Sequence, residues 1–235
     1  MQLFYNPSLA KDTKMLSFDK VESRHIIKVL RKKEGDLLQI TNGNGLLFEA
    51  VIFEANEKHC LVTITSISEK PKSHPYYLHI AIAPTKLNER FEWFLEKATE
   101  IGVDEITPLL CEHSERKVVK SDRLEKILIS ASKQSLHFHH PKLNELTPFS
   151  NFLAQEFKGL KLIAHCDDQD KIPLKQLVKP NERVTILIGP EGDFSLKEIK
   201  LALKNAYKSV SLGNSRLRTE TAGVVACHSI AFINE

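Results

Sequence analysis

The chain has 235 residues, of which 42% are hydrophobic and 27% are charged, and its formal net charge at pH 7 is +3. This length suits one large domain or two modest ones, and the composition can supply a hydrophobic core. The mildly basic balance permits an RNA partner without requiring one. Four widely spaced cysteines form no Cys-x-x-Cys pair, which favours reduced thiols in a cytoplasmic protein and predicts no metal site. No apolar run of about 18 residues is present, so we expect no membrane span.

Residues 1–72 are predicted to form a small β-rich module. Strand candidates rich in β-branched residues cover 37–41, 46–53 and 60–66. Asn42-Gly-Asn-Gly45 predicts a hairpin turn between the first two strands, because Asn and Gly accept the positive φ that such turns need. A short helix with a basic end is predicted over 22–33, and residues 69–75, with two prolines, predict a linker.

From residue 73 onward, strands and helices alternate. Strands are predicted over 77–83, 105–111, 160–165, 184–189 and 209–213, and helices over 88–101, 121–136, 195–207 and 219–233. Gly102 is expected to end the first of these helices. The alternation predicts an α/β domain with a mostly parallel sheet and helices on its faces.

A glycine-containing turn, Gly189-Pro-Glu-Gly-Asp-Phe-Ser195, follows one of these strands. Glycine lets the backbone approach a ligand closely. Ser195 and Glu198 form the pattern of a capping box, so a helix is predicted to begin directly after the turn. The spacing matches neither a P-loop nor a dinucleotide-binding motif. Taken alone, such a turn is structural about as often as it is functional.

A second turn, Leu212-Gly-Asn-Ser-Arg-Leu-Arg-Thr-Glu-Thr-Ala222, again joins a strand to a helix. Thr219 is a candidate N-cap, and Glu220 suits the positive end of the helix dipole. Arg216 and Arg218 require carboxylate, phosphate or solvent partners, and a salt-bridged surface turn is the alternative interpretation.

The chain resembles the ribosomal RNA small subunit methyltransferase E family, of the SPOUT class, along its whole length. Besides the two turns, the similar segments are His25-Ile-Ile-Lys-Val-Leu-Arg31, Lys97-Ala-Thr-Glu-Ile-Gly-Val103, Glu112-His-Ser-Glu-Arg-Lys117 and Lys133-Gln-Ser135. The resemblance implies an RNA-binding, PUA-like β-barrel over 1–72. It also implies a SPOUT methyltransferase domain over 73–235 with a deep trefoil knot, a feature otherwise very rare. A homodimer is implied, with both subunits contributing to each active site.

The activity implied by the resemblance is methylation of N3 of one uridine in 16S rRNA, with S-adenosylmethionine as methyl donor, within ribosome biogenesis. The implied cofactor-binding residues are His165, Ile188, Gly189, Pro190, Glu191, Gly192, Leu212, Gly213, Ser215, Arg216 and Leu217. Arg216 and Arg218 are expected to stabilise the developing uracil anion, and Glu220 to orient an arginine or accept the proton.

The RNA backbone is expected to meet basic residues on both domains, namely Arg24, Lys28, Arg31, Lys32, Lys33, Lys86, Arg90, Arg116 and Lys117. One departure from the family concerns the segment after Ser135, where an arginine usually follows. Here His137 stands in its place. Two alternatives remain open: a SPOUT methyltransferase that acts on tRNA or on a ribose 2′-hydroxyl, or a non-catalytic RNA-binding assembly factor.

Overall fold

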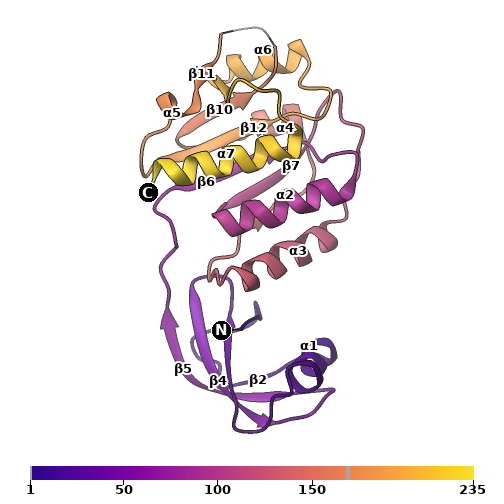
Figure 1. Ribbon diagram of the computed structural model, residues 1–235, viewed down its shortest axis with the longest axis vertical. Helices are drawn as coiled ribbons and strands as arrows, with labels where there is room; N and C mark the ends of the chain where they lie inside the picture. The colour runs from indigo at the N-terminus through magenta and orange to yellow at the C-terminus, as the bar shows by residue number, and fades with distance from the viewer. Residues whose placement is uncertain (1, 168–169) are drawn as a thin grey trace. The chain divides into compact units, whose positions relative to one another are not determined.

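The computed structural model describes residues 2–167 and 170–235, which group into two compact units (Figure 1). The first unit takes the chain up to Lys72 together with Ser132–His140. The second unit takes Ser73–Ala131 and Pro141–Glu235. Across the described ranges, no helix is long and apolar enough to cross a membrane.

The first unit is built on a five-stranded sheet in the order β1-β3-β4-β5-β2. Its strands are β1 (Leu3–Tyr5), β2 (Met15–Ser17), β3 (Leu37–Thr41), β4 (Leu46–Glu54) and β5 (Leu61–Glu69). The predicted hairpin is confirmed, because β3 and β4 pair antiparallel around a turn in which Gly43 and Gly45 have φ values of 76° and 84°. Inward-facing side chains such as Ile40 and Phe48 form the core of this unit.

The helix predicted over 22–33 is shorter than expected. Helix α1 (Lys20–Arg24) begins at Asp19, whose carboxylate accepts the N–H of Glu22 at 2.8 Å, and continues into a π-helical segment, η1 (His25–Val29). Arg31 has a φ of 54°, which a helix cannot contain. The basic run Arg31-Lys-Lys33 therefore follows the helix instead of forming its last turn.

The segment Ser132–His140 lies on the hairpin of the first unit. The N–H of Gly45 donates to the carbonyl oxygen of Phe138 at 2.9 Å, and the N–H of His140 donates to that of Gly43 at 2.8 Å. His139 adds a contact from Nε2 to the carbonyl oxygen of Lys70 at 2.8 Å. The chain thus returns to its first unit some sixty residues after leaving it, which the sequence pattern did not predict.

The second unit is a parallel sheet in the order β11-β13-β10-β12-β6-β7-β8, with β9 paired to β7. Its strands are β6 (Tyr77–Ile82), β7 (Glu105–Leu110), β8 (Lys142–Leu143), β9 (Thr147–Pro148), β10 (Leu160–Ala164), β11 (Ile172–Pro173), β12 (Arg183–Ile188) and β13 (Lys208–Ser211). Its helices are α2 (Asn88–Ile101), α3 (Ser121–Gln134), α4 (Phe149–Leu153), α5 (Leu174–Leu177), α6 (Leu196–Lys204) and α7 (Thr219–Ile233), with the last turn of α3 belonging to the first unit. The expected α/β class is confirmed.

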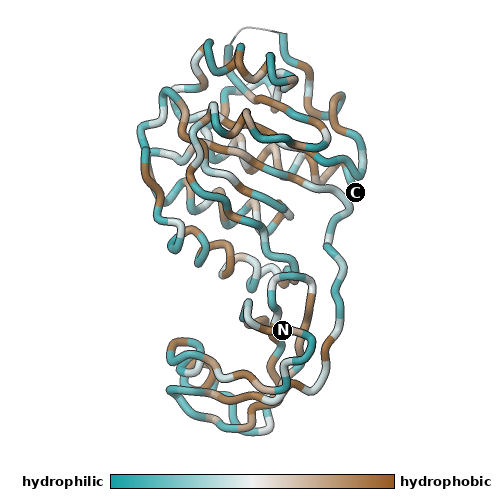
Figure 2. The backbone as a smooth tube through the Cα atoms, turned by 180° about the vertical axis from the view of Figure 1, so that it is seen from behind, coloured by the Kyte–Doolittle hydropathy of each residue, from teal (hydrophilic) through white to brown (hydrophobic). Residues whose placement is uncertain are grey.

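Alternate residues of the central strands face opposite layers of helices. Leu78 and Ile80 of β6 pack in one hydrophobic cluster with residues of α2, α3, α5 and α7. Ala81 of the same strand packs in a second cluster with residues of α4 and α6. Figure 2 shows how hydrophobic (brown) and hydrophilic (teal) residues alternate along the chain that forms these layers.

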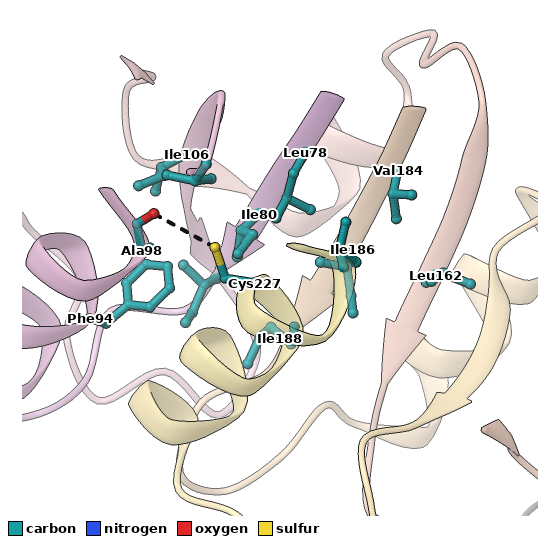
Figure 3. Packing of buried hydrophobic residues seen from close by; sticks show 14 of the residues in the cluster. Leu78, Ile80, Phe94, Ala98, Ile106, Leu162, Val184, Ile186, Ile188 and Cys227 are labelled. Carbon is teal, nitrogen blue, oxygen red and sulfur yellow. Dashed lines mark hydrogen bonds between the residues drawn. The ribbon is translucent and has the colours of Figure 1, made fainter. Parts of the chain in front are cut away.

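Helices α2 and α7 pack closely on the sheet. Figure 3 shows Phe94 and Ala98 of α2 beside Cys227 of α7, whose Sγ donates to the carbonyl oxygen of Ala98 at 3.6 Å. A Cβ atom added at Gly223 of α7 would lie 2.6 Å from the ring of Phe94. Gly102 ends α2 with a φ of 120°, as its position predicted.

Candidate active site

Three neighbouring strands of the parallel sheet, β13, β10 and β12, end at the same edge. Ligands of open α/β sheets bind outside the carboxyl ends of the strands. The loop 189–195 follows β12, and the loop 212–218 follows β13. Because β10 lies between these two strands, its exit at His165 and Cys166 supplies a third wall between the two turns.

One cavity of about 260 Å³ lies beside the turn after β12 and the start of α7. The predicted residues that line it are Ile188, Gly189, Pro190, Glu191, Arg216, Leu217 and Arg218. Its other lining residues are Ala164, Cys166, Asp193, Thr219 and Ala222.

A second cavity of about 380 Å³ lies beside the turn after β13. The predicted residues that line it are His165, Leu212, Gly213, Ser215, Arg216 and Leu217. Five residues are common to both cavities: Ala164, Cys166, Arg216, Leu217 and Ala222. The two cavities are therefore compartments of one site, divided by the exit of β10 and by the Arg216–Leu217 pair.

The two glycine turns are joined by a buried hydrogen bond. Oγ1 of Thr219 donates to the carbonyl oxygen of Gly189 at 3.0 Å. The prediction of Thr219 as an N-cap is wrong, because the N-cap residue of α7 is Arg218 and makes no side-chain capping bond. The hydroxyl of Thr219 has a partner on the other turn instead, which sequence spacing does not reveal.

The capping box predicted at the start of α6 is confirmed. Oγ of Ser195 accepts the N–H of Glu198, and Oε2 of Glu198 accepts the N–H of Ser195 at 2.9 Å. The second oxygen of Glu198 accepts the N–H of Glu112, also at 2.9 Å. One buried carboxylate thus fixes both the start of α6 and the loop that follows β7.

Glu191 holds a neighbouring loop. Its Oε1 accepts the N–H of Lys86 at 2.9 Å. Arg116 acts on the same loop, since its Nε donates to the carbonyl oxygen of Thr85 at 2.9 Å and its Nη2 donates to that of Lys86. The guanidinium of Arg116, which was predicted to contact RNA, therefore binds backbone carbonyl oxygens beside the site.

Gly192 lies on the outer side of its turn. A Cβ atom at Gly192 would lie 3.1 Å from Cβ of His113, whose Nδ1 is 3.0 Å from the carbonyl oxygen of Gly192. Gly192 is absent from the described residues that line the two compartments. Its lack of a side chain serves the contact with His113.

Glu220 is buried and turns toward α2. Its Oε1 lies 3.8 Å from Nε of Arg90, and its Oε2 has no hydrogen-bond partner among the described residues. Arg216 and Arg218, by contrast, are exposed at the mouth of the site. The three residues predicted to be catalytic are thus close in sequence, but only the two arginines line the cavities.

His165 is buried at the end of β10. Its Nε2 lies 2.9 Å from Oγ of Ser209, whereas its Nδ1 has no partner in the described part of the chain. Burial, together with the positive charge of Lys171, lowers the pKa of His165 below its ordinary value. The lowered pKa favours the neutral ring, which is the form that can be buried with one nitrogen unpartnered.

The other basic residues expected to meet RNA differ in their surroundings. Lys28 is paired with Glu57 at 2.7 Å, and Lys86 is paired with Glu115 at 2.8 Å. Exposed side chains are found at Arg24, Arg31, Lys33 and Lys117, while Lys32 is half-buried. His137 is half-buried three residues after the end of α3, and its N–H donates to the carbonyl oxygen of Ser132 at 2.9 Å. Within the described ranges, no group of three or more His, Cys, Asp or Glu side chains could hold a metal ion.

Sequence reasoning missed Cys166, Lys171 and Asp193 as parts of the site. Cys166 directly follows the predicted His165, and Asp193 lies inside the predicted turn. Their positions were therefore indicated, although nothing in the local pattern marked their side chains.

Comparison with known proteins identifies the family of the chain. Residues 72–231 match the family model of an RNA methyltransferase domain, and residues 18–65 match that of an RNA methyltransferase PUA domain. The ribosomal RNA small subunit methyltransferase E of Buchnera aphidicola subsp. Acyrthosiphon pisum is 33% identical over 213 residues, which cover 87% of this chain and 83% of that protein.

Solved structures give the same result. A probable rRNA-methyltransferase from Porphyromonas gingivalis superposes with a TM-score of 0.93 at 43% identity, covering 100% of this chain and 98% of that one. A methyltransferase from Legionella pneumophila, solved with its bound cofactor SAM, superposes with a TM-score of 0.89 at 29% identity, covering 99% and 97%. The chain belongs to the ribosomal RNA small subunit methyltransferase E family, as the resemblance of its motifs predicted.

Proposed function

We propose that this protein transfers a methyl group from S-adenosylmethionine to N3 of a uridine in 16S rRNA of the small ribosomal subunit. The observation that carries the proposal is the site at the ends of β10, β12 and β13, where two backbone-lined compartments meet beneath Arg216 and Arg218. Membership in the family supports the reaction class, and the cytoplasm, where ribosomal subunits are modified, is the proposed location.

The residues of the site fit S-adenosylmethionine. Gly213 has a φ of 138°, and a Cβ added there would meet nothing within 4 Å, so its backbone lies open to the larger compartment. His165 also lines that compartment, although its unpartnered Nδ1 is itself buried. The backbones of Gly189, Leu212 and Gly213 are the groups that would hold the cofactor, which supplies an activated methyl group when bound.

The chain's own part in the reaction is to make uracil N3 reactive. N3 carries a proton, and the loss of that proton to solvent leaves negative charge shared between N3 and the uracil carbonyl oxygens until N3 has bonded to the methyl group. Arg216 and Arg218 line the mouth of the site and are the donors that would stabilise this charge. Glu220 contributes through Arg90, because its carboxylate is buried against α2 and away from the cavity lining.

The target base must leave its stack to reach the site. The exposed residues Arg31 and Lys33 are the best candidates for holding the RNA backbone on the PUA-like unit, since their charges are not compensated by a carboxylate within 4 Å in the described chain. Lys117 is the corresponding candidate on the methyltransferase unit.

A homodimer is part of the proposal, and helix α7 supports it. From Thr221 to Ile233 the helix has no charged residue except for His228 when protonated, and Phe232 is 66% exposed. A helix that is apolar on all sides is expected to be covered on all sides. A second copy of the chain is the proposed cover, and the trefoil knot of the family is proposed for the segment that contains β10, β12 and β13.

Two measurements test the function. The midpoint temperature of thermal unfolding should rise when S-adenosylmethionine is added. This result would distinguish an enzyme from an RNA-binding scaffold that does not bind the cofactor. Nucleoside analysis of rRNA from a strain that lacks the gene should show loss of 3-methyluridine, and the wild-type gene should restore it. Normal 3-methyluridine in that strain, or methylation of tRNA by the purified protein, would contradict the proposed substrate.

A further inference from the structure

Asp193 occupies a backbone position that suits glycine better than aspartate. Its φ is 62°, in the left-handed region, and its N–H closes the turn by donating to the carbonyl oxygen of Pro190 at 2.9 Å. Glycine reaches this region without strain, whereas Asp and Asn reach it at a modest cost. The turn itself therefore does not require the carboxylate.

The carboxylate of Asp193 instead joins two loops that are far apart in sequence. Its Oδ2 accepts the backbone N–H of Cys166 at 2.7 Å. The backbone pairing of β10 with β12 ends at Ala164 and Ile188, so this bond replaces the next connection between the strands. A side chain of the β12–α6 turn thus holds the backbone as it leaves β10.

The turn that carries Asp193 is itself held from its other side. Nδ1 of His113 lies 3.0 Å from the carbonyl oxygen of Gly192 and 3.1 Å from that of Asp193. A single N–H at Nδ1 serves both oxygens. Asp193 is therefore a fixed support for Cys166.

Cys166 is the point at which this support acts on the site. It lines both compartments, beside Ala164 and the Arg216–Leu217 pair. Asp193 lines the smaller compartment. A displacement of the Cys166 backbone would therefore change the shape of both compartments at once.

We propose that Asp193 is a positioning residue, which holds the backbone of Cys166 through its carboxylate and so fixes the dividing wall of the methyl-donor site. The inference rests on the proposed function. The effect belongs mainly to cofactor binding, because the groups proposed to face the uracil, Arg216 and Arg218, lie on the loop 212–218 and are not bonded to Asp193.

The test compares two substitutions at this position. Asp193→Gly keeps the turn, because glycine accepts the positive φ, but it removes the bond to Cys166. We expect the Kd for S-adenosylmethionine to rise about tenfold, as the loss of a hydrogen bond to a charged acceptor implies, and kcat at saturating cofactor to change far less. Asp193→Asn keeps an oxygen that can accept the N–H of Cys166, so its Kd should lie nearer to the wild-type value than to that of the glycine variant.

Ala206→Gly is the matched control for added backbone freedom. Ala206 also has a positive φ, 64°, and it follows α6 outside both compartments. The melting temperature of the Ala206→Gly variant should change by about as much as that of Asp193→Gly. The Kd of Ala206→Gly for S-adenosylmethionine should stay at the wild-type value.

Amide hydrogen exchange of the protein without cofactor gives a second readout. The N–H of Cys166 should exchange about tenfold faster in Asp193→Gly than in the wild type, because its acceptor is gone. A wild-type Kd for S-adenosylmethionine in Asp193→Gly would overturn the positioning role. A Kd in Asp193→Asn as high as that of Asp193→Gly would also overturn it, since the carboxylate would then act by its charge. Failure of the wild-type protein to bind S-adenosylmethionine would instead refute the proposed function itself, and the positioning role with it.

Discussion

Arg218 is exposed at the mouth of the smaller compartment, and it is also the N-cap residue of α7. Its side chain makes no capping bond, so the guanidinium is available to a substrate. A group that stabilises developing negative charge on a substrate needs a fixed backbone and a side chain that is free to donate to that substrate, and Arg218 has both.

Arg218→Ala should lower kcat for RNA methylation by about 10²–10³, the usual cost of removing one donor to a developing negative charge. The Kd for S-adenosylmethionine should change by less than about threefold, because the contacts proposed for the cofactor come from backbone groups. A methylation assay with a separate cofactor titration measures both quantities, and Lys197→Ala on the exposed face of α6 is the control. Full turnover by Arg218→Ala would remove this residue from the chemistry.

Lys33 and Lys28 form a matched pair on the PUA-like unit. Both are exposed, but Nζ of Lys28 lies 2.7 Å from a carboxylate oxygen of Glu57. Lys33→Gln should therefore reduce the slope of log K against log salt for binding of a 16S rRNA fragment by about one, and Lys28→Gln should reduce it less. Slopes that stay at the wild-type value in both variants would place the RNA elsewhere.

At the scale of secondary structure elements, the contact of α7 with α2 depends on Gly223. A methyl group there would meet the Phe94 ring at 2.6 Å and Cδ1 of Ile82 at 2.9 Å. Alanine favours a helix over glycine by about 1 kcal/mol, but overpacking a core costs about 1–3 kcal/mol. Gly223→Ala should therefore lower the free energy of unfolding by about 1 kcal/mol in urea titrations. Ser229→Ala on the same helix carries the propensity gain without the clash, and a stabilised Gly223→Ala would show that the helices can separate at little cost.

The sequence predicted the elements that have a strong local pattern. A short apolar run located β10, a run of β-branched residues located β12, and the Ser195–Glu198 pair located the start of α6. Strands β8, β9 and β11 have two residues each, too few for any periodicity to appear. They form because neighbouring strands offer backbone partners, which is a tertiary effect.

In the candidate site, too, the features with a local sequence signal were predictable and those that depend on tertiary contacts were not. The glycine turns and the arginines were predictable because their residue types are local signals. The Thr219–Gly189 and Asp193–Cys166 bonds span 30 and 27 residues, so only the order of the strands brings their partners together. The expected domain limits of 1–72 and 73–235 stay a prediction about independent folding, and the structure groups Ser132–His140 with the first of these segments.

At the scale of the molecule, buried titratable groups set the pH range of stability. His79 is buried beside the ring of Phe152, and its Nε2 lies 2.8 Å from Oγ1 of Thr107. Burial lowers the pKa of His79 to about 4. In the unfolded chain the same ring titrates near 6.5. Between these values the unfolded chain binds a proton that the folded chain does not. Stability is therefore lost as the pH falls from 6.5 to 4.

The neighbouring Glu105 extends this loss to lower pH. Burial alone raises the pKa of its carboxyl, but hydrogen bonds from Asn144 and Tyr77 outweigh burial and lower it to about 2. Urea unfolding should show a decrease of up to about 3 kcal/mol between pH 7 and pH 4.5, the size that the His79 shift implies. His79→Gln should flatten the profile in this window. An unchanged free energy of unfolding in the wild type would contradict the buried, neutral state of the ring.

The proposed dimer is testable through the exposed face of α7. Phe232→Glu places a carboxylate on a helix face whose other side chains, apart from His228 stacked on Phe232, are apolar or small and polar, so association measured at pH 8 should weaken by at least about tenfold because the charge would be buried. Sedimentation equilibrium measures the dimer–monomer equilibrium, and Leu203→Glu on α6, where the leucine is 38% exposed, is the control. An undisturbed dimer in Phe232→Glu would exclude this face.

The order of the strands has a consequence for the path of folding. The site has walls from β10, from the turn after β12, from the turn after β13 and from Thr219 and Ala222 of α7. Walls this far apart in sequence come together only when long loops have closed, which costs conformational entropy before any contact compensates for it. The site is therefore expected to form late in folding, and any partly unfolded state in which α7 leaves the sheet has lost it.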